Sequence, residues 1–165
     1  MTATIAVAIT DLIASAKKWM KGAASAALFS HWLEVNPVPA SRPRVTRWGT
    51  HYSKTYEGFR RAAAKQLEKA DGAPTDAPLL VLVECVVEKP RTGKLSAPRG
   101  DVDNYAKGPL DALTKAEKFW KDDDQIQMLV VAKRYAKPGE QPGTNVMWTA
   151  LDDNPASKRK LKHDL

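Results

Sequence analysis

The run Leu79–Val87 constrains the fold most, because every residue in it except Glu84 is apolar. A short, continuous apolar run that follows a break containing Pro74 and Pro78 is typical of a strand buried on both faces of a sheet. Cys85 lies inside this run, so we expect a buried thiol rather than a nucleophile. As the only cysteine it excludes an intrachain disulfide, and zinc-finger and iron–sulfur sites are excluded with it.

The flanking patterns predict helices and strands around this central strand. Ser53 can cap a helix that runs to about residue 69, with an apolar stripe at Tyr56, Phe59, Ala63 and Leu67. Residues 104–118 predict a second helix, in which Pro109 predicts a kink or the start of the regular part.

Strands are predicted at residues 32–35, 126–135 and 146–151, and a flexible loop at residues 89–100. The alternation of strands and helices predicts an α/β (α+β) fold. Its sheet would be mixed, with about four strands and helices packed on it.

The chain divides into three zones. Residues 1–30 predict an amphipathic helical extension, residues 31–151 a single compact domain, and residues 152–165 a basic tail. The apolar stretch near the start is too short to span a bilayer, and its lysines follow it, whereas a signal peptide carries them first. We therefore expect a cytoplasmic protein.

The charge balance suggests a polyanionic partner. The chain has 26 basic and 19 acidic residues, a net charge of +7, which fits nucleic acid or merely a soluble, positive surface. Arg42, Arg44 and Arg47 lie in a proline-stiffened, extended segment, and guanidinium groups bind phosphates in bidentate fashion. The alternative is a solvated loop. We include Lys54 and Lys133 among the candidate DNA-binding residues.

Acidic residues concentrate in one window of this basic chain, at Asp101, Asp103, Asp122, Asp123 and Asp124. Asp101 and Asp103 would lie on the same side of an extended backbone. If these groups converge, a cation must hold them together, and oxygen ligands without His or Cys favour Mg²⁺ or Mn²⁺. Such ions promote phosphodiester cleavage. The alternative is structural, with Asp103 as a helix N-cap and the other group as a solvated turn.

Lys107 follows Asp103 by one helical turn, so the two would share a face of the predicted helix. A lysine beside carboxylates can contact the scissile phosphate or neutralise a leaving oxygen. A plain salt bridge is the alternative.

Three segments in this order resemble the RusA family of Holliday-junction resolvases over roughly residues 33–151. They read VNPVPASRPRVTRWGTHYSKTY, GDVDNYAKGPLDAL and WKDDDQIQMLVVAKRY. The resemblance implies a homodimeric, Mg²⁺-dependent endonuclease, with Mn²⁺ as a substitute metal. Such an enzyme cuts paired strands of four-way DNA junctions symmetrically, in recombination and repair, in bacteria or their prophages.

By position, the resemblance makes Asp101, Asp103 and Asp123 the metal-binding and catalytic aspartates and Lys107 the essential lysine. Asp122 and Asp124 flank Asp123, so the choice of the third aspartate stays open among them. Residues 1–30 and the basic tail lie outside the family pattern. Two other functions remain open: a protein that binds branched DNA without cutting it, and a metal-dependent nucleotide phosphohydrolase.

Overall fold

The structure is a computed structural model that describes residues 28–47, 49–92 and 94–151. The predicted basic tail, and all but the last three residues of the predicted N-terminal extension, lie outside the described residues. No helix in the described part of the chain is long and apolar enough to cross a membrane.

A mixed four-stranded sheet forms the centre of the fold, which confirms the predicted α+β class. Its strands are β1 (Phe29–Leu33), β4 (Leu79–Val87), β5 (Ile126–Tyr135) and β6 (Gly143–Ala150), in the order β1-β6-β4-β5. β4 pairs in parallel with β5, and the other two pairs are antiparallel. β4 lies between β6 and β5, and seven of its nine residues are buried, in keeping with its nearly continuous apolar sequence.

Two strands begin earlier than the sequence predicts. β1 starts at Phe29, inside the predicted extension, and β6 starts at Gly143. The start of β6 shows no apolar pattern, because its first three residues are Gly143, Thr144 and Asn145, of which the first two are buried. A Cβ atom at Gly143 would lie 2.2 Å from a ring carbon of Trp32.

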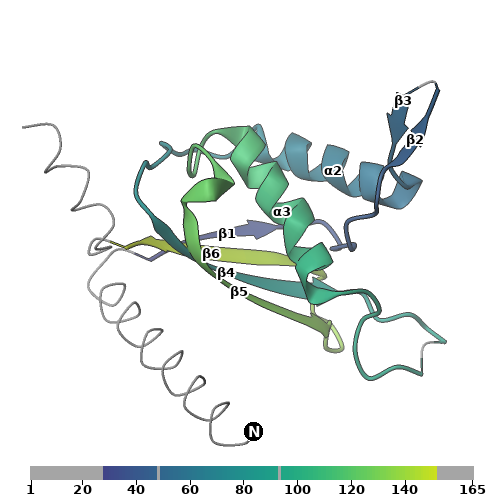
Figure 1. Cartoon of the computed structure of the whole chain (residues 1–165). Helices are drawn as coiled ribbons and strands as arrows, with labels where there is room; N and C mark the ends of the chain where they lie inside the picture. The colour runs from purple at the N-terminus through teal and green to yellow at the C-terminus, as the bar shows by residue number, and fades with distance from the viewer. Residues whose placement is uncertain (1–27, 48, 93, 152–165) are drawn as a thin grey trace, which may run out of the picture.

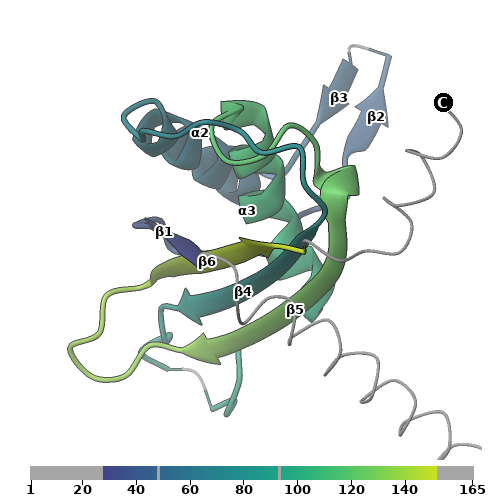
Figure 2. The same ribbon diagram turned by 90° about the vertical axis from the view of Figure 1, so that its left-hand side faces the viewer.

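Helices α2 (Lys54–Leu67) and α3 (Val102–Ala116) cover the same face of the sheet (Figures 1 and 2). The predicted cap and stripe of α2 are confirmed: the Ser53 hydroxyl accepts from the Tyr56 N–H at 3.3 Å, and all four stripe residues are buried. The two helices pack closely at Gly108, where a Cβ atom would lie 2.9 Å from the Phe59 ring.

Pro109 lies inside α3 and is not its start. A proline leaves the carbonyl four residues earlier without its helical N–H partner. Here that carbonyl belongs to Tyr105, and the Cys85 thiol donates to it at 3.7 Å. Burial raises the pKa of Cys85 to about 11, so the thiol keeps its proton and can donate. Cys85 is buried, as predicted, and supports the helix from β4.

The arginine-rich segment forms a small hairpin that the sequence analysis did not predict. β2 (Arg44–Thr46) pairs antiparallel with β3 (Gly49–His51), and this two-stranded sheet projects away from the four-stranded sheet (Figure 1). The extended backbone was predicted, but the pairing was missed because the turn is marked only by Gly49, whose φ is +126°.

Candidate active site

Asp101 and Asp103 stand at the start of α3, which follows the carboxyl end of β4 through the loop of residues 88–100. The N-cap is Asp101 and not Asp103, because the helix begins at Val102. The Asp101 carboxylate makes no capping hydrogen bond; an Asn104 side-chain N–H reaches it at 3.4 Å. Both aspartates are exposed, and the positive end of the helix dipole favours negative charge there.

The other aspartates lie in a short helix, η1 (Asp123–Gln125), directly before β5. Asp122 caps η1, with its carboxylate accepting from the Asp124 N–H at 3.1 Å. The Gln125 side chain accepts from the Asp122 N–H at 2.9 Å and donates to two carbonyl groups of the segment before β4. The D-D-x-Q pattern therefore builds a fixed turn in which Asp122 is the cap and Asp123 is an exposed carboxylate.

Asp111 is an acidic residue that the sequence analysis missed. It lies on α3, one turn after Lys107, and the two form an ion pair with a 3.7 Å separation. The pKa of Asp123 is raised by partial burial, then by a hydrogen bond with Asp122 and by the charges of Asp122 and Asp111. Asp111 thus belongs to the same acidic group as Asp123. The available signal was its spacing, four residues after Lys107 on one helix face.

In the metal-free protein, Asp123→Asn is expected to raise the melting temperature at neutral pH. The raised pKa of Asp123 means that the folded state binds its proton more tightly than the unfolded state. Its stabilising contribution is present below the unfolded pKa, about 3.9, and is lost as the pH rises through the folded value. Thermal melts in EDTA between about pH 4 and pH 7 measure this.

The gain from Asp123→Asn should shrink as the pH falls. Asp71→Asn, at another exposed aspartate, is the control and should leave the melting temperature unchanged. An Asp123→Asn gain that does not vary with pH would contradict the assigned electrostatic cause.

One protomer does not bring the three candidate ligands together. Within residues 28–47, 49–92 and 94–151, no three His, Cys, Asp or Glu side chains are placed to hold a metal ion. Asp123 precedes Ile126, where β5 begins, whereas the residue before Asp101 contacts Lys133, seven residues along β5. At about 3.3 Å per residue, Ile126 and Lys133 are about 23 Å apart along β5. Asp101 and Asp103 therefore form one acidic group at the start of α3, and Asp123 with Asp111 forms a separate one near the start of β5.

The predicted DNA-binding residues do not share one environment. Three of them are exposed: Arg42, which precedes the β2–β3 hairpin, Arg47, which lies in its turn, and Lys54, which follows it. Arg44 is the first residue of β2. Lys133 is different, because its ammonium group donates to the backbone carbonyl groups of Pro98 and Gly100.

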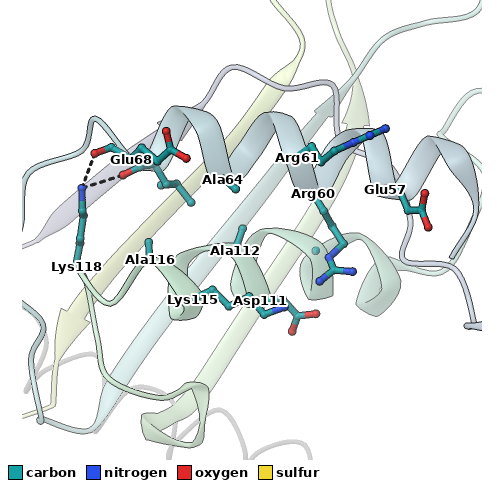
Figure 3. Close-up of a pocket in the computed structure, with 12 residues that line it drawn as sticks. Glu57, Arg60, Arg61, Ala64, Glu68, Asp111, Ala112, Lys115, Ala116 and Lys118 are labelled. Carbon is teal, nitrogen blue, oxygen red and sulfur yellow. Dashed lines mark hydrogen bonds between the residues drawn. The ribbon is translucent and has the colours of Figure 1, made fainter. Parts of the chain in front are cut away.

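A groove of about 820 Å³ between α2 and α3 adds basic residues that the sequence analysis did not select. Figure 3 shows Arg60 on α2 extending toward Asp111 on α3, whereas the Arg61 side chain points away from α3. Arg60 also lies over the Tyr52 ring, 5.1 Å from its centroid. The groove wall carries both signs of charge, because Glu57, Glu68 and Asp111 line it together with these basic residues.

Comparison with known families assigns the chain to one of them. The family model described as "Endodeoxyribonuclease RusA" matches residues 34–147, more than half of the chain. That range contains the two acidic groups, Lys107 and the arginine hairpin. A search of curated proteins gives no match. The chain belongs to the RusA endodeoxyribonuclease family, and is therefore an enzyme that hydrolyses DNA.

Proposed function

We propose that this endodeoxyribonuclease resolves four-way DNA junctions by symmetric cleavage, requires Mg²⁺, for which Mn²⁺ substitutes, and serves recombination and repair. Family membership supports junction resolution by a metal-dependent nuclease. The observation that carries the proposal is the pair Asp101 and Asp103, two exposed carboxylates in the first turn of α3. Asp101 occupies the cap position without capping, and although one of its carboxylate oxygens accepts from the Asn104 side chain at 3.4 Å, the carboxylate keeps lone pairs for another partner.

The donors fit a hard divalent cation, because Asp101, Asp103 and Asp123 offer only carboxylate oxygens. A bound Mg²⁺ supplies activation of water and stabilisation of charge on the scissile phosphate. Lys107 is exposed one turn beyond Asp103. Its ammonium group, held near the helix face by Asp111, stabilises charge that develops on the phosphate.

We propose that the site is completed in a homodimer. In this dimer, a two-fold axis would bring the first turn of α3 in one protomer next to the last turn of α3 in its partner. The same symmetry creates this contact twice, once for each protomer. Asp101 and Asp103 of each protomer would then share a metal with Asp123 of the partner subunit. The edge strand β5 exposes the apolar side chains of Leu129 and Val130, 43% and 49% accessible, on opposite faces of the sheet, and a strand edge can pair with another chain. A four-way junction also has two-fold symmetry and two strands to cut.

The DNA backbone is proposed to contact Arg42, which precedes the β2–β3 hairpin, Arg44 and Arg47 within it, and Lys54 after it. These residues lie within a short stretch of chain, and exposed cations that neutralise phosphates supply affinity without reading sequence. Because binding and cutting depend on different residues, each can be removed separately.

Incubation with a labelled four-way junction and with a linear duplex of the same sequence tests this proposal. With Mg²⁺, we expect paired nicks at symmetric positions in the junction and little cutting of the duplex. In EDTA, the protein should bind the junction without cutting it, since binding depends on the basic residues. Binding without cutting in Mg²⁺ as well would indicate a non-cleaving junction-binding protein. Nucleotide hydrolysis that ignores branching would indicate a phosphohydrolase.

A further inference from the structure

The ammonium group of Lys133 is used inside the protein. Lys133 lies on β5 opposite Cys85 of β4, and its side chain reaches the turn before α3. Its Nζ donates to the carbonyl oxygen of Pro98 at 2.9 Å and to that of Gly100. It also lies 5.4 Å from the centroid of the Tyr105 ring. A lysine ammonium group has three N–H donors. Two of them bind carbonyl groups here, and the positive charge also lies near an aromatic ring, which attracts it.

The turn that Lys133 contacts is held at every residue. The Tyr105 hydroxyl donates to the Arg99 carbonyl at 3.0 Å, so the carbonyl groups of residues 98, 99 and 100 each accept from a side chain. Gly100 has a φ of +97°, and a Cβ atom there would lie 3.1 Å from the Pro39 ring. The backbone at Gly100 thus has a conformation that residues with a side chain rarely adopt, and Pro39 leaves little room for a Cβ atom there.

Asp101 comes directly after this turn. Its own carbonyl accepts from the Tyr105 N–H at 3.3 Å, so backbone contacts hold the residue on both sides. Its carboxylate is exposed and makes no capping bond. The position of the carboxylate thus depends on a backbone that Lys133 and Tyr105 hold in place.

We propose that Lys133 is a positioning residue, which fixes the turn of residues 98–100 and so aims the Asp101 carboxylate at the metal. This inference rests on the proposed function, in which Asp101 is a ligand. It gives Lys133 a role apart from the phosphate contact expected from its charge, because a phosphate would have to compete with two backbone carbonyl groups. Groups that orient metal ligands affect metal affinity or activity by about 10- to 100-fold.

Lys133→Met is expected to raise the Mg²⁺ concentration for half-maximal junction cleavage by about 10-fold or more. The dissociation constant for the uncut junction in EDTA, and its dependence on salt, should stay close to the wild-type values. Tyr105→Phe removes the hydroxyl that binds the Arg99 carbonyl but keeps the ring. It should raise the Mg²⁺ requirement in the same direction, and it tests the proposal if Lys133→Met does not fold.

Lys137→Met removes the same charge from an exposed lysine four residues later and should leave the Mg²⁺ requirement unchanged. A salt slope for Lys133→Met that flattens by about 0.9, with an unchanged Mg²⁺ requirement, would show a phosphate contact and overturn the proposal. An unchanged Mg²⁺ requirement in both Lys133→Met and Tyr105→Phe would also overturn it. If the wild-type protein cuts no junction at any Mg²⁺ concentration, the proposed function itself fails, and the inference fails with it.

Discussion

Asp101→Asn is expected to reduce junction cleavage by about 100-fold or more, equivalent to about 2.7 kcal/mol of transition-state stabilisation. The substitution keeps the shape of the side chain but replaces a charged metal ligand with a neutral amide. The helix should persist, because the Asp101 side chain makes no capping bond in the native protein. Binding to the uncut junction should be nearly unchanged, since it depends on basic groups. Single-turnover cleavage and a binding titration in EDTA measure the two effects.

The double variant Arg42→Ala with Arg44→Ala is the matched comparison and should show the reverse pattern. It should weaken binding and flatten the salt slope by roughly one to two units, since each lost phosphate contact removes about 0.9. The bound complex should still be cut. If Asp101→Asn retains a tenth of wild-type cleavage, Asp101 is not a metal ligand.

The elements that the sequence predicted well are those whose burial repeats with a regular period. Leu79–Val87 was recognisable because a central strand is apolar on both faces, and α2 because a capping serine precedes a regular apolar stripe. The β2–β3 hairpin and the start of β6 were missed because neither has an apolar period. The first shows only a single turn glycine, and the second begins at a glycine that a tryptophan ring requires.

The candidate residues could be selected from the sequence, but their arrangement in space could not. Asp103 and Lys107 are four residues apart, which is one turn of the predicted helix. The sequence could not show that Asp123 lies at the opposite end of the parallel pair β4–β5, because that depends on strand register. Nor could it show that Lys133 reaches the turn before α3, since the two are neighbours only after folding.

A mixture of two proteins, one with Asp101→Asn and the other with Asp123→Asn, is expected to recover cleavage that neither protein has alone. If each metal site takes Asp101 from one protomer and Asp123 from the other, one site of a mixed dimer carries both substitutions. The second site then carries neither. With random pairing, roughly half of the dimers are mixed and each has one intact site, so about a quarter of the wild-type sites return. These dimers should nick one strand of the junction and not both.

A control separates this recovery from simple mixing effects. The double variant Asp101→Asn with Asp123→Asn, in one chain, is mixed with wild-type protein. A mixed dimer then has one substitution in each shared site and no intact site. Only the wild-type dimers, about a quarter of the total, should cut. A site built within a single chain would leave about half of the sites intact in this mixture.

The most direct measurement is therefore the nicking of a labelled four-way junction by the two single variants, refolded together and assayed in Mg²⁺. Activity near a quarter of the wild-type value, absent from each variant alone and abolished by EDTA, is the expected result. Activity of the mixture no greater than that of the separate variants would contradict a metal-dependent junction nuclease whose carboxylates are shared between two subunits.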